Sequence, residues 1–560
     1  MTTQLHDHGH GEGHRHPDED LPEGSVVDGE ALTRSIDDVF DVVIVGSGAA
    51  GATAAHTLTA AGLSVGIVEE GPWLKTKDVV KDVHTAFGRV MRQSGMQVLQ
   101  GRAYMPMLQG RCVGGSTLVN SAIAWRIPED VVDDWAARFG LGITMQGLEP
   151  HFDALERDLS VREVDPSVLG ENNRLFVEQA KRHGFEAAPM RRYDRGCKGS
   201  GMCLTGCPNA AKQGMSVTYV PWSLQRGARI FTSCAVEHVE ISGGRAVAVR
   251  ARAASGHLVT VYARRAVLVA ASTVQSPNVL RRSGIRAAAL GRHFQAHPGL
   301  AIGGLFPSMR GARDARDARD GGVERPIRMA FGATQGAEST HFRLSDRFKL
   351  ETISLPPDLA GARIPGVGRE LTERLAQLSN VAVWAAQVRA EAEGVVTSGW
   401  GGADRVKYTM TTADLEAARK ACTLIVRMLF EAGACEVWPG IYSPHVPSVL
   451  RSIDDVRHLE NAPLDPRSYN FIATHLFGAA RMGPDPATSV VDLDFQVHGV
   501  AGLHVVDSSV FPTNLGVNPQ HSIMAMSRLA ATRIAERSVS RARGAGARRA
   551  KVLDEAVPPA

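Results

Sequence analysis

A glycine-rich turn near the N-terminus constrains the fold of this 560-residue chain more than any other feature. The turn contains Gly46, Gly48 and Gly51; it follows the apolar run 41–45 and opens the alanine-rich stretch 49–61. In a strand–turn–helix unit of this kind, the first glycine permits the tight turn, the second lets the backbone approach a pyrophosphate, and the third lets the helix pack on the strand. The N-terminus of that helix offers amide donors and a partial positive charge to phosphates. The turn therefore predicts a dinucleotide-binding α/β domain.

Further apolar runs extend this prediction to a whole sheet. The run that begins at residue 63 reaches Glu69, 23 residues after Gly46, where an acid that binds the ribose is expected. Similar runs occur at 266–272 and 502–509. Continuous apolar runs are typical of strands that are buried on both faces of a parallel sheet. The less regular region between about 300 and 470 is expected to form a separate substrate domain.

Composition excludes several classes of function. The formal net charge is only +3, so nothing indicates a nucleic-acid partner. No run of eighteen apolar residues predicts a membrane-spanning helix, and the first residues do not resemble an export signal. Seven cysteines in a chain of this length do not form a disulfide framework. Reduced thiols and a cytoplasmic location are the default expectation.

Three segments are expected to lie outside a packed core. Residues 1–38 are polar and rich in histidine, which predicts a disordered tail, with weak metal capture as a less favoured alternative. An Ala-Arg-Asp repeat at 311–322 predicts a solvated loop or a short exposed helix. Residues 538–560 are basic and are expected to form a disordered tail.

Five ordered blocks between residues 39 and 537 resemble the flavin-dependent glucose–methanol–choline (GMC) oxidoreductases. Besides the first turn, they are the glycine-rich stretch 110–120, the stretch 271–298, the block 475–483 and the block 491–519. The resemblance implies a Rossmann-like FAD-binding domain that is assembled from separated segments. These segments are 39–130, 225–300 and 470–537. Residues 131–224 and 301–469 would form an α+β substrate domain with a mainly antiparallel sheet.

The same resemblance implies the residues that bind FAD. Some members of the family attach the flavin to a histidine one position before the asparagine of the second glycine motif. Val119 occupies that position here, so non-covalent FAD is expected. The expected cofactor-binding residues are Gly46, Gly48, Gly51, Glu69, Arg111, Gly114, Gly115, Ser116, Asn120, Val236, Asp507, Ser508 and Pro519.

A catalytic pair also follows from the resemblance. Oxidation of an alcohol needs a base for the hydroxyl proton, and histidine has a suitable pKa. His475 matches the base of the family, and Asn518 matches its partner, which donates a hydrogen bond to the developing alkoxide. His521 lies three residues after Asn518 and is a weaker candidate for the pocket. The histidines expected to be framework residues are His293, His297, His498 and His504.

Three of the seven cysteines, Cys197, Cys203 and Cys207, fall within eleven residues. Thiolates are soft ligands that suit Fe–S clusters or zinc. The spacing is similar to the loop that holds a [3Fe-4S] cluster in bacterial FAD-dependent glucose dehydrogenase. The alternatives are reduced thiols, a cysteine loop like that of long-chain alcohol oxidases, or zinc with a remote ligand. The remaining cysteines are expected to be small buried residues, and any of them could supply a fourth ligand; they are Cys112, Cys234, Cys422 and Cys435.

These features together predict an FAD-dependent dehydrogenase that oxidises a sugar or another alcohol. Its electrons would pass through the cluster to an acceptor protein or a quinone, because a cluster offers a one-electron exit from a two-electron flavin. A small companion subunit, which could also bring about export, is a further candidate partner. The alternatives are an oxygen-using alcohol oxidase, a flavoprotein without turnover and, as the weakest, an NAD-dependent dehydrogenase.

Overall fold

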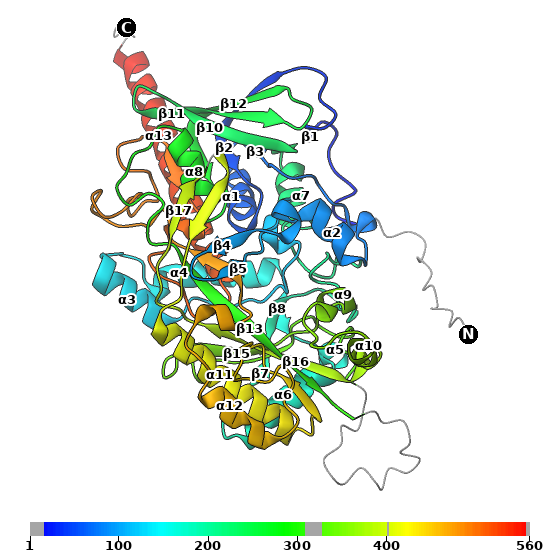
Figure 1. Cartoon of the computed structure of the whole chain (residues 1–560). Coiled ribbons are helices and arrows are strands. Elements are labelled where there is room, and N and C mark those ends of the chain that lie inside the picture. Colours follow the sequence, from blue (N-terminus) through cyan, green and yellow to red (C-terminus); the bar gives the residue numbers. More distant parts are fainter. Residues whose placement is uncertain (1–15, 308–326, 400–401, 556–560) are drawn as a thin grey trace.

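The computed structural model describes residues 16–307, 327–399 and 402–555, with side chains described up to Ser538. Two large sheets dominate the chain, and Figure 1 shows them at opposite ends of the molecule. The sheet that contains β2 lies with α1, α8 and α13 at one end, and the sheet that contains β13 and β16 lies with α11 at the other. The expected division into a nucleotide-binding part and a substrate part therefore corresponds to two separate sheets.

The first sheet has the strand order β1-β9-β3-β2-β12-β11-β10, and β21 also pairs with β12. The neighbouring strands β1, β9, β3, β2 and β12 run parallel, as does β21 beside β12. β11 and β10 continue the sheet in antiparallel fashion. All four apolar runs noted in the sequence form its parallel strands, as expected for strands that are buried on both faces. The strands are β1 (Val26–Asp28), β2 (Ile36–Val45), β3 (Val65–Val68), β9 (Arg229–Thr232), β10 (Cys234–Ser242), β11 (Arg245–Ala253), β12 (Leu258–Val269) and β21 (Leu503–Val505).

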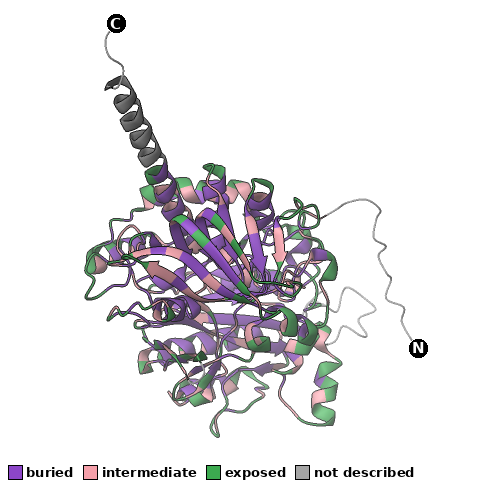
Figure 2. Cartoon of the chain, turned by 90° about the horizontal axis from the view of Figure 1, so that it is seen from above, coloured by how far each residue is buried: buried purple, intermediate pink, exposed green. Residues whose placement is uncertain are grey.

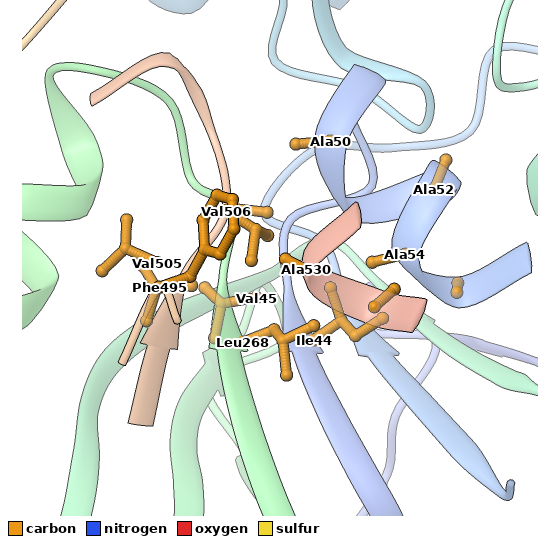
Figure 3. Close-up of a cluster of buried hydrophobic side chains, with 14 of the residues drawn as sticks. Ile44, Val45, Ala50, Ala52, Ala54, Leu268, Phe495, Val505, Val506 and Ala530 are labelled. Atoms are coloured by element: carbon orange, nitrogen blue, oxygen red, sulfur yellow. The ribbon is translucent and has the colours of Figure 1, made fainter. Parts of the chain in front are cut away.

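Two helices pack on one another over the centre of this sheet: α1 (Ala49–Ala60) and α13 (Gln520–Glu555). The side chains of α1 that face inward are mostly alanine, and small residues allow the close approach of a helix to the strands beneath it. Figure 3 shows Ala54 of α1 beside Ala530 of α13, above Ile44 and Leu268 of the central strands. In Figure 2 the strands of this sheet are largely buried, while exposed residues gather in the peripheral loops. This packing fixes the turn between β2 and α1.

The second sheet is antiparallel throughout and has the order β19-β13-β16-β15-β14-β7, with β20 also paired to β13. Its core contacts the helix α11 (Thr412–Glu431), which begins with a capping box formed by Thr411 and Asp414. The mainly antiparallel substrate sheet that we expected is confirmed. The strands are β7 (Ala188–Pro189), β13 (Gln295–Leu305), β14 (Ala337–Ser339), β15 (Phe348–Thr352), β16 (Val381–Val388), β19 (Glu436–Trp438) and β20 (Ile472–Phe477).

The remaining elements surround these two sheets. A small sheet of β17, β18, β4 and β5 and a pair formed by β6 and β8 complete the strands. The strands are β4 (Val98–Gln100), β5 (Tyr104–Pro106), β6 (Val161–Glu163), β8 (Arg191–Tyr193), β17 (Val395–Ser398) and β18 (Asp404–Lys407). The helices are α2 (Val83–Val90), α3 (Glu129–Phe139), α4 (Met145–Asp158), α5 (Pro166–Leu169), α6 (Glu171–Arg182), α7 (Tyr219–Gln225), α8 (Gln275–Arg282), α9 (Pro357–Gly361), α10 (Arg369–Leu375) and α12 (Arg457–Glu460).

The predicted disordered tail 1–38 is wrong for the part that the structure describes. The carboxylate of Asp18 is buried and accepts hydrogen bonds from the backbone N–H of Thr76 at 2.7 Å and from its hydroxyl at 3.2 Å. β1 then extends the edge of the first sheet by pairing with β9. A polar composition did not reveal these tertiary partners, which compensate the ordering cost of the segment.

Two other boundaries differ from the prediction. β20 lies in the segment 470–537 that we assigned to the FAD domain, yet it pairs with β13 of the second sheet. α13 continues as a helix to Glu555, past the expected start of a tail at residue 538. The Ala-Arg-Asp repeat lies outside the described residues. None of the described helices has the length and apolar character needed to cross a membrane.

Candidate functional site

A cavity of about 1170 Å³ is lined by residues from both sheets. On one side it contacts the turn after β2, and on the other it contacts β15, β16 and β20. Of the residues expected from the sequence, Gly51, Gly114 and the three cysteines do not line it. The expected residues that do line it are Gly46, Gly48, Glu69, Arg111, Gly115, Ser116, Asn120, Val236, His475, Asp507, Ser508, Asn518 and Pro519.

The three glycines of the first turn have different steric surroundings. Gly46 has a φ of +94°, and a Cβ there would lie 2.6 Å from the carbonyl oxygen of Ala270. A Cβ on Gly51 would lie 1.9 Å from the carbonyl oxygen of Gly46, so only glycine lets α1 begin this close to the turn. Around Gly48 the nearest atom would be 3.9 Å away, which leaves the space open toward the cavity. No side chain caps the N-terminus of α1, so its first amide groups remain available to an anion.

Glu69, at the end of β3, is buried and held in place by three donors. It accepts hydrogen bonds from the Ser47 N–H at 2.9 Å, the Ser47 hydroxyl at 2.6 Å and the Gly71 N–H at 2.9 Å. Burial raises the pKa of this carboxyl group, although the three donors oppose that shift. Glu69 also lines the cavity, where a ribose-binding acid is expected.

The second glycine-rich stretch lies across the N-terminus of α1. A Cβ on Gly115 would lie 3.0 Å from the Cα of Gly48, and the N–H of Gly114 donates to the hydroxyl of Ser47 at 3.1 Å. The hydroxyl of Ser116 accepts a hydrogen bond from the N–H of Gly110 at 3.0 Å. Small residues therefore bring two backbone segments into contact at the edge of the cavity, although they are far apart in the sequence.

The other residues expected to bind the cofactor come from several segments. Asn120 donates to the side chain of Gln520 at 2.5 Å, which connects the second glycine stretch to the start of α13. Arg111 forms an ion pair with Glu70 at 3.0 Å. Asp507 is buried and accepts a hydrogen bond from the N–H of Ser272 at 2.9 Å. The remaining three are Ser508 after β21, Val236 on β10 and Pro519 before α13.

His475 and Asn518 line the same cavity, although His475 lies on β20 of the second sheet and Asn518 lies in the segment before α13. Burial, reinforced by the positive charge of Lys349, lowers the pKa of His475 to about 3. The imidazole is therefore neutral near pH 7. Its Nδ1 lies 3.4 Å from Nδ1 of His297, a residue that we expected to be only framework. The antiparallel register of β13 and β20 places the two histidines opposite each other, a relation that is not visible in the sequence.

Lys349 on β15 is a further polar residue at the site that the sequence did not reveal. Its side chain is fully buried, and its Nζ donates to the Oδ1 of Asn518. The same Nζ pairs with Glu338 and lies 3.4 Å from Glu351. A lysine in an alternating strand sequence usually points to solvent, so the pattern around residues 348–352 gave no signal of this role.

His521, the weaker histidine candidate, lies in the interior and does not line the cavity. Its Nδ1 is 2.8 Å from the hydroxyl of Tyr193, and its Nε2 is 3.4 Å from Glu156. Burial lowers its pKa, whereas Glu156 acts in the opposite direction. The geometry favours a structural role at the start of α13.

The cysteine loop lies against the second glycine stretch. The Nζ of Lys212 donates to the carbonyl oxygens of Leu118 at 2.5 Å, Asn120 at 2.8 Å and Cys203 at 2.8 Å. The thiol of Cys203 accepts from Arg192 at 3.3 Å. Burial alone would raise the pKa of this thiol, but the charges of Arg192 and Lys212 lower it below its usual value.

The positions of the three thiols do not fit a metal centre. Within the described ranges, no three Cys, His, Asp or Glu side chains converge closely enough to hold a metal ion. Cys197, Cys203 and Cys207 do not form such a group, and the predicted [3Fe-4S] cluster gains no support from the geometry. It stays a prediction from the spacing of the cysteines.

Comparison with known families agrees with the fold. The N-terminal model of the GMC oxidoreductases matches residues 40–299, and the C-terminal model matches residues 401–527. The chain belongs to the GMC oxidoreductase family. It is thus an FAD-dependent oxidoreductase of the type that acts on CH–OH groups, as the resemblance implied.

The relatives include both uncharacterised and named proteins. An uncharacterised GMC-type oxidoreductase of Mycobacterium tuberculosis is 34% identical over 94% of this chain and 79% of its own length. Another, from Sinorhizobium fredii, is 30% identical over 89% of this chain and 94% of its own length. A long-chain-alcohol oxidase of Arabidopsis thaliana is 26% identical over 89% of this chain and 66% of its own length.

Solved structures of oxidases share the fold. Formate oxidase of Aspergillus oryzae superposes with a TM-score of 0.66 at 17% identity, over 90% of this chain and 99% of the oxidase. A pyridoxine 4-oxidase superposes with a TM-score of 0.65 at 17% identity, over 88% of this chain and 98% of its own chain. At this identity the likeness establishes the architecture alone.

Proposed function

We propose that this chain oxidises an alcohol with an apolar body by hydride transfer to non-covalently bound FAD, with His475 as the base and Asn518 as its hydrogen-bonding partner. One observation carries the proposal: His475 and Asn518 line the same cavity as the nucleotide turn. A cavity shared by a flavin site and a base is the arrangement that CH–OH oxidation requires.

The residues around the cavity fit FAD. The open space at Gly48, the uncapped start of α1 and the acid Glu69 suit a pyrophosphate and a ribose. Val119 lines the cavity with a side chain that cannot form a covalent link to flavin. FAD bound there would supply the acceptor for a hydride.

His475 and Asn518 have different roles toward the substrate hydroxyl group. The imidazole of His475 is unprotonated near neutrality and can accept the hydroxyl proton, although the lowered pKa also makes it a weaker base than an ordinary histidine. Asn518 can donate to the same oxygen as negative charge develops on it, without competing for the proton. A buried site strengthens both interactions relative to water.

The part of the cavity near the second sheet combines a group of large apolar side chains with the polar residues Glu351 and Gln387. Its lining includes Leu300, Ile353, Leu355, Leu359 and Ile472. A sugar hydroxyl that faces these apolar side chains would lack a partner, which is costly, whereas an alkyl chain would be buried favourably against them. This lining favours an apolar alcohol over the sugar that we had also considered, and the likeness to long-chain-alcohol oxidases agrees with it.

The proposal also concerns the electron acceptor that reoxidises the flavin. We retain a dehydrogenase that uses an [3Fe-4S] cluster at Cys197, Cys203 and Cys207 as one hypothesis, with an acceptor protein, a quinone or a companion subunit as partner. Its support is the cysteine spacing and the nearby cations Arg192 and Lys212. Because the thiols do not converge, we derive no step through a cluster. An oxygen-using oxidase is the second hypothesis, supported by the named oxidases among the relatives.

Two measurements separate these hypotheses. A dehydrogenase with a cluster should contain iron in a fixed ratio to flavin, reduce artificial acceptors and form little peroxide in air. An oxidase should lack iron and form one peroxide per alcohol oxidised. Iron-free protein that reduces artificial acceptors would reject the cluster and leave the dehydrogenase.

The base is tested by anaerobic mixing of the holoenzyme with 1-dodecanol, choline or glucose while the flavin absorbance is recorded. We expect 1-dodecanol to bleach the flavin fastest. His475→Ala should retain FAD but slow the bleaching by about 10²-fold or more, since general-base catalysis contributes typically 10²–10⁴-fold. His445→Ala, which removes an exposed histidine, is the matched control. Full-rate bleaching by His475→Ala would reject the assignment.

A further inference from the structure

A group of charged and polar residues covers one face of the second sheet behind Asn518. Lys349 and Glu351 alternate on β15 and therefore point to the same face. Glu338 of β14 lies opposite Glu351, and Gln387 of β16 lies opposite Lys349. The strand register thus gathers one cation, two acids and an amide beside the cavity, which Glu351 and Gln387 also line.

The hydrogen bonds of this group use every donor of the lysine. The Nζ of Lys349 contacts Glu338, Glu351 and the Oδ1 of Asn518. An ammonium group has three donor hydrogens, so it is fully satisfied by these partners. The two acids have additional donors: the indole of Trp125 donates to Glu338 at 2.8 Å, and Gln387 donates to Glu351 at 2.6 Å.

A buried ionic group of this kind needs an explanation beyond stability. Lys349 has no exposed surface, and the side chains of Glu338 and Glu351 are 8% and 4% exposed. Replacement of buried ion pairs by well-packed apolar residues is often neutral or stabilising, so stability alone gives little reason to keep one here. Asn518, one of the two proposed reacting-site residues, lies outside the second sheet and accepts a hydrogen bond from Lys349; the ring of Trp125 also lies 5.7 Å from the Nζ.

The chemistry of the contact fixes the orientation of the asparagine. Lysine donates hydrogen bonds and accepts none, so the Asn518 carboxamide must present its oxygen to Lys349. The other branch of the carboxamide, the Nδ2 amide group, is then the one that remains for a substrate in the cavity. A flipped carboxamide would place its N–H groups against the ammonium and an acceptor toward the substrate.

We propose that Lys349 is a positioning residue that locks Asn518 with its amide donor directed at the substrate oxygen, and that Glu338 and Glu351 hold Lys349 in place. This inference rests on the proposed function, because it assumes that Asn518 donates to that oxygen. Lys349 itself does not touch the substrate; its effect passes through Asn518.

A double-mutant cycle tests this coupling. The holoenzyme forms of wild type, Lys349→Met, Asn518→Ala and the double variant are mixed anaerobically with 1-dodecanol, and the rate constant of flavin bleaching and the apparent Kd of the alcohol are measured. Methionine keeps the length of the side chain but donates nothing. We expect Lys349→Met to slow bleaching at least tenfold in wild type with little change in Kd, and by less than twofold in Asn518→Ala. A loss that requires Asn518 identifies coupling, since independent sites give additive effects.

The alternative outcomes are distinct. The inference is overturned if Lys349→Met bleaches within twofold of wild type, or if it slows Asn518→Ala by the same factor as wild type. If Asn518→Ala itself bleaches at the wild-type rate, the proposed function is contradicted at this residue, and the inference fails with it. If only the lysine variant is normal, the inference alone fails.

Two further variants guard against a folding effect. FAD content, the visible absorbance of bound flavin and the melting temperature are measured for each protein. If Lys349→Met does not retain FAD, the variant Lys349→Met/Glu338→Gln replaces it under the same criteria, because it removes the buried acid that would otherwise be left unpaired. If this variant also fails to retain FAD, the role of Lys349 is structural and the inference is overturned. Lys420→Met, which removes an exposed ion pair with Asp346, is the matched control and should bleach at the wild-type rate.

Discussion

Two glycines of the nucleotide turn give a paired test, because their steric surroundings are opposite: Gly51 is tightly enclosed, whereas the space around Gly48 is open. Gly51→Ala would place a methyl group 1.9 Å from the carbonyl oxygen of Gly46. Alanine in place of glycine inside a helix contributes about 1 kcal/mol of stability, whereas overpacking of a rigid site costs about 3 kcal/mol or more. We therefore expect Gly51→Ala to lower the free energy of unfolding by about 2 kcal/mol or more.

Gly48→Ala should behave differently. Its φ of −67° is open to any residue, and the added methyl would lie 3.9 Å from its nearest neighbour. The apoprotein should lose about 1 kcal/mol or less, the usual cost of alanine at an N-cap. The methyl would nevertheless occupy the space next to the phosphates. Loss of two charge-assisted hydrogen bonds, at about 1.5 kcal/mol each, corresponds to a roughly 100-fold weaker Kd for FAD.

The assay has two parts. The two apoproteins are unfolded in urea, and each is titrated with FAD while the quenching of flavin fluorescence is recorded. The reasoning predicts a stable Gly48→Ala that binds FAD poorly and an unstable Gly51→Ala. Wild-type affinity of Gly48→Ala for FAD, or wild-type stability of Gly51→Ala, would refute it.

Three further predictions address the cofactor link, the base and the N-terminal segment. Because Val119 cannot form a link to flavin, acid precipitation should release all flavin into the supernatant, and flavin that stays on the chain would contradict this. Burial and Lys349 lower the pKa of His475 to about 3, so the rate of flavin bleaching by 1-dodecanol should vary less than about twofold between roughly pH 5.5 and 8. A fall in this rate as the pH drops through about 6.5 would instead indicate a histidine with an ordinary pKa. Asp18→Ala should lower the free energy of unfolding by about 1–3 kcal/mol in urea, because it removes hydrogen bonds to Thr76, whereas the exposed control Asp20→Ala should not.

The sequence predicted the parts of the fold that local patterns encode. The turn with Gly46, Gly48 and Gly51 carries its geometry in the residues themselves, since only glycine fits two of these positions. The parallel strands were evident from continuous apolar runs, because burial on both faces removes the alternation that an exposed strand shows. The prediction of an antiparallel substrate sheet rested instead on the resemblance to the family.

The parts that were missed depend on contacts between distant segments. Nothing near Lys349 in the sequence distinguishes a buried lysine from an exposed one, and its partner Asn518 lies 169 residues away. His297 does not line the cavity, but its contact with His475 depends on the register of β13 and β20, which the sequence does not show. Asp18 lies in a segment whose polar composition suggested disorder, yet it is buried against Thr76.

The central claim is that an alcohol reduces the flavin of this chain by hydride transfer with His475 as the base. The most direct measurement is anaerobic bleaching of the flavin by 1-dodecanol and by the same alcohol deuterated at C1, in wild type and in His475→Ala. The account predicts bleaching by wild type that is several-fold slower with the deuterated alcohol, as expected when the C–H bond breaks in the measured step, and almost no bleaching by an FAD-bound His475→Ala variant. Equal rates in wild type and His475→Ala, or no bleaching of wild type by any alcohol tested, would contradict it.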